Sequence, residues 1–260
     1  MGERDPDPGE EGRRMMSAIV LPFRRTSPDA APADVEDDTT AVPRPARTAA
    51  GVHVDGWGRD GVLVDRISAV ARLRWDVAVG GAERLPARAG ALVVVNARLF
   101  SLAPVFSALA LGEHTGRPVR FVGRPDTAPV GALMRRLGGL LEHPDEVANA
   151  LAAKEIVVMG TGRELHPQRV GRVDHRLIAA AVQERVRVHP AAALSSPMSR
   201  SARAEVGTEV NTGRSRRGPL AELELADAVR RRILQLMEEL SGWRSAPLLD
   251  WLPQTGMGGD

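Results

Sequence analysis

The sequence lacks several residue types, and each absence excludes a class of chemistry. None of its 260 residues is cysteine, which excludes disulfide bridges, thiolate metal ligands and cysteine nucleophiles and fits residence in the cytoplasm. It has no tyrosine, Lys154 is its only lysine, and aromatic residues make up 3% of the chain. Basic stripes interleaved with aromatic side chains, which are typical of nucleic-acid binding, are therefore missing. We expect no nucleic-acid partner.

Long hydrophobic runs are also missing. No segment approaches the about 18–20 apolar residues that a membrane-spanning helix needs. The patch "RRMMSAIVLPFRR" near the N-terminus is preceded by acidic residues and has no small-residue cleavage site after it, unlike a signal peptide. Residues 1–50 otherwise hold too few apolar side chains to offset the entropy of ordering. We predict a disordered acidic, proline-rich tail over 1–50, a folded domain over 51–242 and a C-terminal tail over 243–260.

The charge is unevenly distributed. Residues 1–50 contain 7 Arg against 10 Asp and Glu, whereas the rest of the chain contains 28 Arg and Lys against 23 Asp and Glu. A mildly basic body is attracted to anionic membrane surfaces and to phosphate groups. A solvated arginine-rich surface explains the same composition. The charge distribution therefore leaves two expectations, peripheral membrane association and an ordinary solvated surface.

Strand and helix patterns alternate along the body. Continuous apolar runs predict buried strands, and apolar residues at helical spacing predict the helices between them. The strands are expected at 75–79, 91–96, 118–123, 155–160 and 186–190, with a late edge-type strand within 202–210, and the helices near 63–70, 104–109, 129–137, 144–155, 177–182 and 223–240. This order predicts an α/β fold with a mostly parallel sheet flanked by helices.

Local signals place the ends of three helices. Asp126 or Thr127 can cap the helix that has Pro129 in its first turn and a glycine pair at its end. Asp174 can cap the helix near 177–182, and Ser101 can cap the helix that contains Pro104. The apolar face of the last helix is predicted to comprise Leu223, Ala226, Val229, Ile233, Leu236 and Leu240.

Ligands of parallel sheets bind beyond the carboxyl ends of the strands. Asn96 and Gly160 stand at two such ends. The segment "MGTGRE" after the second of them lacks both the dinucleotide fingerprint and the P-loop lysine, although its backbone amides could hold an anion. Arg98 and Arg124 follow strand ends and could pair with a phosphate. Ser101 lacks the elbow motif of a hydrolase nucleophile.

The six histidines are His53, His114, His143, His166, His175 and His189. None forms a metal-ligand pair at helical spacing. We expect surface or capping roles for each of them, and no metal site.

The order of these elements resembles the phospholipid/glycerol acyltransferase family over about residues 64–242. The family's first two strands are similar to "RWDVAVGGAERLPARAGALVVVN", and its next strand and helix are similar to "RFVGRPDTAPVGALMRRLGGL". Its Phe-Pro-Glu-Gly-Thr-Arg segment is similar to "EIVVMGTGRE". Its C-terminal helix is similar to "LAELELADAVRRRILQLMEEL". The resemblance implies an acyltransferase-like fold. It also implies acyl-CoA or acyl carrier protein as the donor and a lysophospholipid or glycerol phosphate as the acceptor.

The functional positions depart from the family's pattern. The resemblance implies a His-x-x-x-x-Asp motif directly after Asn96, in which His is the general base and Asp orients it; Ala97 and Leu102 stand at these positions. Met159 stands where the family has Glu, whereas Gly160 and Thr161 match. "LLEHP" stands near the expected position of an arginine that binds the acceptor's phosphate.

Three hypotheses follow. The first is a homologue without the catalytic dyad, a pseudoenzyme that binds a lipid or acyl chain through Arg98, Arg124, Met159, Gly160, Thr161 and Arg163. The second is an active O-acyltransferase with a rearranged site. The third is a regulatory subunit of a lipid-synthesis enzyme. No further cofactor is expected.

Overall fold

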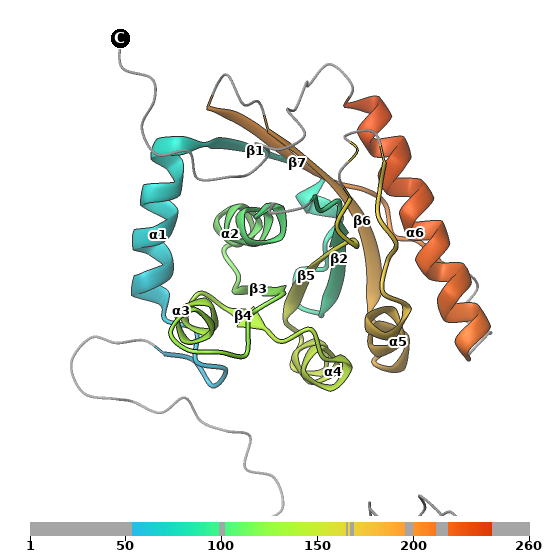
Figure 1. The fold of residues 1–260 in the computed structure, drawn as a ribbon, viewed down its shortest axis with the longest axis horizontal. Helices are drawn as coiled ribbons and strands as arrows, with labels where there is room; N and C mark the ends of the chain where they lie inside the picture. Colours follow the sequence, from blue (N-terminus) through green and yellow to red (C-terminus); the bar gives the residue numbers. More distant parts are fainter. Residues whose placement is uncertain are drawn as a thin grey trace, which may run out of the picture. The chain divides into compact units, whose positions relative to one another are not determined.

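The computed structural model describes residues 54–98, 102–164, 166, 169–195, 200–211 and 218–240. Within them, seven strands form one sheet in the order β1-β7-β6-β2-β5-β3-β4 (Figure 1). The strands are β1 Asp76–Gly80, β2 Ala91–Val95, β3 Val119–Val122, β4 Gly139–Leu140, β5 Ile156–Gly160, β6 Arg187–Ser195 and β7 Ser201–Val206. All neighbours run parallel except β6 and β7. The predicted α/β fold with a mostly parallel sheet is confirmed; both predicted tails lie outside the described residues.

Helices cover both faces of the sheet. They are α1 Gly61–Arg74, α2 Ala103–Thr115, α3 Val130–Arg136, α4 Pro144–Ala152, α5 His175–Gln183 and α6 Pro219–Glu239. Figure 1 shows α1, α2 and α3 on one face and α4, α5 and α6 on the other. Two apolar clusters fill the two interfaces, and the alternating residues of β2 divide between them.

The central strand β2 explains why its sequence shows no alternation. All five of its residues have 0% exposure, since one set of side chains meets α2 and the other meets the helices of the opposite face. Burial on both faces selects a continuous apolar run. The runs that predicted β2 and β5 therefore end at the same edge of the sheet, with Val95 paired to Gly160.

The late strand was predicted as an edge strand, and this prediction is wrong. β7 lies between β1 and β6. Its sequence alternates because Arg203 and Glu205 occupy one face, where Glu205 pairs with Arg203 at 3.1 Å and with Arg84 at 3.6 Å. Paired charges let this face remain polar inside a sheet.

The start of α3 also differs from the prediction. Pro129 is itself the N-cap residue, and neither Asp126 nor Thr127 occupies that position. Thr127 instead offers its backbone carbonyl to the N–H of Gly131 at 2.8 Å. The helix ends as predicted at the glycine pair, where Gly138 adopts a φ of 97° that other residues rarely adopt.

The last helix is confirmed, with one exception on its predicted apolar face. Leu223 is 41% exposed, whereas the other five residues of that face are buried. Leu223 lies in the N-terminal part of α6, at the mouth of the cavity described below. Of the helices described, none is both long enough and apolar enough to cross a membrane.

Candidate functional site

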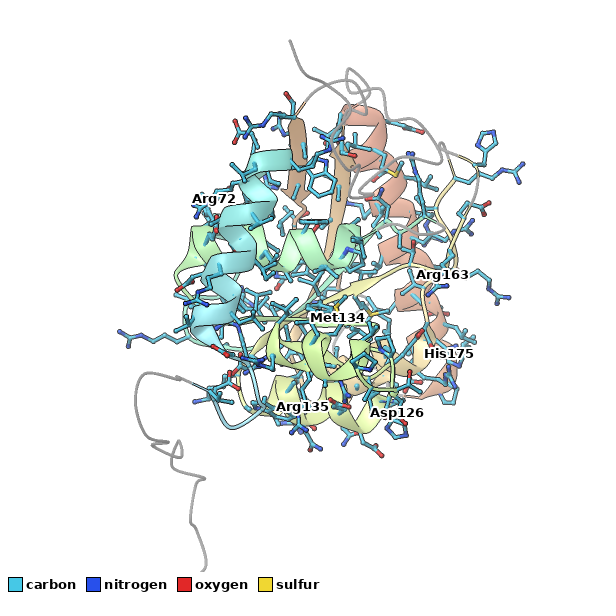
Figure 2. All side chains as sticks on the ribbon, turned by 60° about the vertical axis from the view of Figure 1, so that its left-hand side comes forward. Arg72, Asp126, Met134, Arg135, Arg163 and His175 are labelled. Atoms are coloured by element: carbon cyan, nitrogen blue, oxygen red, sulfur yellow. The ribbon has the colours of Figure 1, made fainter. Side chains whose placement is uncertain are left out.

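A cavity of about 1120 Å³ opens at the carboxyl edge of the sheet. Ala97 follows β2, Gly123 follows β3 and Gly160 ends β5, and all three line it. Figure 2 labels three further lining residues from distant segments, Met134 of α3, Arg163 and His175. The cavity, called the cleft below, lies where ligands of parallel α/β sheets bind.

The lining combines an apolar set with a charged set. The apolar side chains include Leu102, Val105, Phe121, Val122, Met134, Met159, Val173, Leu177, Leu223 and Ala226. The charged side chains are Arg98, Arg163, Arg172 and Arg176 against Glu142, Asp174 and Asp227. Such a lining suits an amphiphile with an apolar tail and an anionic group.

Thr161 forms hydrogen bonds that hold the loop directly after β2 in place. Its backbone N–H donates to the carbonyl of Val95 at 2.9 Å, which extends the β2–β5 ladder by one step. The backbone N–H of Ala97 donates to Thr161 Oγ1 at 3.0 Å. At the end of the β2–β5 ladder, the Thr161 side-chain oxygen thus accepts a hydrogen bond of the kind that strand carbonyls accept within the ladder.

Asn96 holds the same loop in place from the side of β6. Its side-chain amide donates to the carbonyl of Ala193 at 3.0 Å and accepts from the N–H of Ala193 at 2.6 Å. The residue is 3% exposed, and this amide acts as one more rung between β2 and β6. Asn96 therefore positions the loop and does not face the cleft.

Gly160 allows the close approach of the two chain segments. A Cβ atom built on it would stand 3.0 Å from both Ala97 Cβ and Pro104 Cγ. Contacts this short force neighbours to move. Gly160 and Thr161, which match the family's segment, hold the walls of the cleft together here.

The residues predicted to form the site are largely brought together. Ala97, Arg98, Leu102, Met159, Gly160, Thr161 and Arg163 all line the cleft. Arg124 instead directs its guanidinium to Glu146 at 3.3 Å, and Ser101 lies outside the described residues. Leu102, rather than Ser101, is the N-cap residue of α2.

The backbone amides of the glycine-rich segment have partners within the protein. Thr161 N–H donates to Val95, and Gly162 N–H donates to the carbonyl of Arg172 at 2.6 Å. These two amides are therefore engaged within the protein and do not face an anion.

Sequence reasoning missed the contribution of α5 to the cleft. Asp174 caps α5 as predicted, accepting from the N–H of Arg176 at 2.9 Å. The Arg176 guanidinium, also 2.9 Å away, is the main reason that the pKa of Asp174 is lowered. His175, the first residue of α5, lines the cleft beside this pair. The capping signal located α5, but no sequence signal indicated that its start faces the cleft.

His189 was expected to have a surface or capping role, but it is buried. It is 1% exposed within β6, and its Nδ1 atom lies 3.1 Å from the carbonyl of Gly207. Burial is the main cause that lowers the pKa of its imidazole. His143, by contrast, caps α4 as expected, accepting from the N–H of Asp145 at 3.4 Å. In the part of the chain that the structure describes, no three His, Asp or Glu side chains form a group that could hold a metal ion.

Comparison with known proteins gives one result for the sequence and another for the fold. No protein-family profile and no curated protein sequence matches the chain. Among solved structures, the fold is similar to the crystal structure of the 1-acyl-sn-glycerophosphate (LPA) acyltransferase PlsC from Thermotoga maritima, with a TM-score of 0.53 and 18% sequence identity. The similarity covers 70% of this chain and 81% of that one. The acyltransferase-like fold predicted from the order of motifs is confirmed.

Proposed function

We propose that this chain is a glycerolipid-acyltransferase homologue that binds a lysophospholipid or a similar acyl-bearing amphiphile in the cleft, without the family's histidine-dependent acyl transfer. The observation that carries the proposal is the pair Ala97 and Leu102. Both line the cleft, at the two positions where the resemblance implies the general base and its orienting carboxylate. Neither side chain can move a proton, and a positioned base supplies about 10²–10⁴ in rate.

The retained residues support a binding role. Gly160, Thr161 and Asn96 stabilise the walls of the cleft through packing and hydrogen bonds that involve no substrate. Their retention is therefore explained without catalysis. The cavity volume of about 1120 Å³ lies just above the usual range for small-molecule sites of about 300–1000 Å³ and is large enough for an acyl chain together with its headgroup.

The charges of the lining support an anionic headgroup. Arg163 and Arg172 are exposed side chains at the cleft, and together with Arg98 and Arg176 they outnumber the three lining carboxylates. Because Arg176 is paired with Asp174, Arg163 and Arg172 are the better partners for a phosphate. Replacing both with glutamine should weaken binding of a lysophosphatidate and leave binding of an uncharged monoacylglycerol nearly unchanged.

The test is an acyl-transfer assay. Purified protein receives acyl-CoA or acyl carrier protein thioesters with lysophosphatidate or glycerol 3-phosphate. The proposal predicts no turnover above background for the natural sequence. Turnover that is saturable and is lost on replacing cleft residues would contradict it. The double variant Ala97→His with Leu102→Asp then asks whether the remaining site supports chemistry, although a buried Asp carries a cost of its own.

A second candidate, an active O-acyltransferase with a rearranged site, is favoured by one observation. His175 lines the cleft and neighbours Asp174 in the chain, so an imidazole and a carboxylate are both present. In this case His175→Ala would abolish turnover, whereas His114→Ala, at a histidine outside the cleft, would leave it intact.

We also propose that the cleft mouth contacts a membrane surface. Val130 and Leu133 of α3 and Leu220 and Leu223 of α6 are 41–70% exposed, and both helices contribute to the cleft lining. Leu133→Glu and Leu220→Glu should reduce sedimentation with vesicles of phosphatidylcholine and phosphatidylglycerol. Leu73→Glu on α1, which replaces a side chain that is 73% exposed, is the matched control and should have no effect. Equal loss in all three variants would contradict this surface.

A further inference from the structure

Helix α1 presents large apolar side chains on its solvent-exposed side. Val62, Val70 and Leu73 are 39%, 62% and 73% exposed. Figure 2, in which α1 comes forward, shows no other described helix lying over it. Single exposed apolar residues are common on protein surfaces, but several on one helix face form a patch of the kind that marks an interaction surface.

The exposed residues of α1 follow the spacing of a coiled coil. Val62, Arg66, Ala69 and Leu73, called the α1 stripe below, are all exposed and are separated by four, three and four residues. This is the alternation of the a and d positions of a heptad. Because α1 has 14 residues and is about 21 Å long, the stripe runs along nearly all of it. The spacing predicts that a second helix packs along α1.

The α1 stripe complements itself when a second copy of α1 lies antiparallel to it. Val62 then packs against the partner's Leu73, and each such contact occurs twice about a two-fold axis. Arg66 packs its aliphatic stem over the small side chain of the partner's Ala69. A parallel arrangement would instead place the two Arg66 side chains against each other, and like charges at close range repel. The residues of the stripe therefore favour the antiparallel arrangement.

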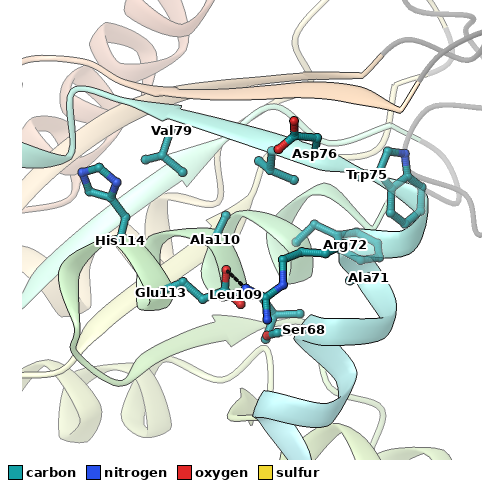
Figure 3. Close-up of a pocket in the computed structure, with 12 residues that line it drawn as sticks. Ser68, Ala71, Arg72, Trp75, Asp76, Val79, Leu109, Ala110, Glu113 and His114 are labelled. Carbon is teal, nitrogen blue, oxygen red and sulfur yellow. Dashed lines mark ion pairs between the residues drawn. The ribbon is translucent and has the colours of Figure 1, made fainter.

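The charges beside the α1 stripe also complement each other. Asp65 and Arg72 flank it on one side and are exposed, and the antiparallel arrangement brings Asp65 beside the partner's Arg72 twice. Within one protomer, Arg72 pairs with Glu113 of α2 at 3.8 Å, as Figure 3 shows, with both side chains more than 40% exposed. Exposed ion pairs contribute little stability, so Arg72 can turn to a carboxylate of the partner.

We propose that α1 packs antiparallel against α1 of a second copy of this chain, through the α1 stripe and two Asp65–Arg72 ion pairs. A contact one helix long is small beside specific interfaces of about 1200–2000 Å², so we expect a weak dimer with a dissociation constant of about 10–100 μM. The stripe shares no residue with the cleft. The dimer is therefore independent of the function proposed above, and vesicle sedimentation at submicromolar protein reports on the monomer.

Charge reversal tests the partner and the arrangement together, with sedimentation velocity at protein concentrations that bracket this dissociation constant. Asp65→Arg alone and Arg72→Asp alone should each weaken dimerisation by about tenfold, because two attractive pairs become repulsive. The double variant should recover the natural affinity to within about threefold. Positions 65 and 72 of one protomer are about 10 Å apart along the helix, so this recovery arises between protomers. Arg231→Asp, at an exposed position of α6, is the matched control and should have no effect.

Disulfide trapping tests the register, and the absence of cysteine from the chain leaves no background. A mixture of Val62→Cys and Leu73→Cys should form cross-linked dimers under mild oxidation, because these positions face each other. Either variant alone should not, because like positions are then about 16 Å apart, beyond the reach of a disulfide.

Three results would overturn the proposal. They are a natural sequence that stays monomeric at all concentrations, a double charge variant that dimerises no better than the single ones, and cross-linking that is as fast in one cysteine variant alone as in the mixture. With the first result, the exposed face of α1 would be assigned to a different protein or to a membrane.

Discussion

The backbone N–H of Ala97 donates a 3.0 Å hydrogen bond to Thr161 Oγ1, across the end of the β2–β5 ladder. This bond joins the loop that would carry the catalytic base to the loop that carries the retained Gly-Thr pair. The cleft is thus built by interactions that are independent of any base. Its architecture therefore does not depend on an ionisable side chain at position 97 or 102.

Thr161→Val tests this bond directly. The substitution keeps the shape of the side chain but leaves the buried N–H of Ala97 without an acceptor. We expect a loss of about 1–3 kcal/mol in the free energy of unfolding, measured by urea denaturation. Thr161→Ser, which keeps the hydroxyl, should lose less. Equal losses in the two variants would show that the methyl group, and not the hydrogen bond, matters.

Asn96→Leu tests the pair of hydrogen bonds between the Asn96 side chain and Ala193 of β6. It removes both hydrogen bonds to Ala193 and leaves a buried N–H and a buried carbonyl unsatisfied. The free energy of unfolding should fall by about 2–4 kcal/mol. Hydrogen exchange at Ala193 should accelerate more than exchange at Val158 in the interior of β5. An unchanged exchange rate at Ala193 would contradict the assigned role.

Gly160→Ala tests the close approach of the cleft walls. The added Cβ meets Ala97 Cβ and Pro104 Cγ at 3.0 Å, so we expect a loss of about 1–3 kcal/mol through overpacking. Adding Ala97→Gly should recover part of that loss, because it removes one of the two contacts. A double-mutant cycle by thermal or urea unfolding measures this coupling, and strictly additive effects would contradict the packing described.

The imidazole of His189 predicts a pH dependence of stability. Burial lowers its pKa in the folded state below the ordinary value of 6.5. The unfolded state therefore binds the proton more readily, so stability is full above about pH 6.5 and falls as the pH drops through the folded-state pKa. His189→Gln should flatten this part of the stability profile between pH 7 and 5. A profile that is unchanged by the substitution would contradict the assignment.

Apolar periodicity and caps predicted most of the fold, because buried strands and amphipathic helices leave local signals. Asp174 was identified as a cap because its signal lies in neighbouring residues. Arg120 gave no such signal: it stands within the apolar run of β3, is 1% exposed and pairs with Asp55 at 2.5 Å and with Glu155 at 3.4 Å. Partners 35 and 65 residues away can be found only in the folded structure.

The candidate site also has a part that could be predicted from the sequence and a part that could not. The resemblance assigned Ala97, Leu102 and Gly160 to motif positions of the family, and the structure brings the three residues together in the cleft. The side of the cleft formed by α5 and α6 was not predicted. His175 and Leu223 reach it through the packing of two helices that lie far apart in the sequence from β2.

The most direct test of the central claim is a calorimetric titration of 1-oleoyl-lysophosphatidate into three forms of the protein. They are the natural sequence, Leu102→Trp, which narrows the cleft beside Ala97 and Gly160, and Leu73→Trp, which adds the same side chain at an exposed position of α1. The account predicts saturable binding to the natural sequence and to Leu73→Trp, and at least tenfold weaker binding to Leu102→Trp. No binding to the natural sequence, or equal binding to all three forms, would contradict it.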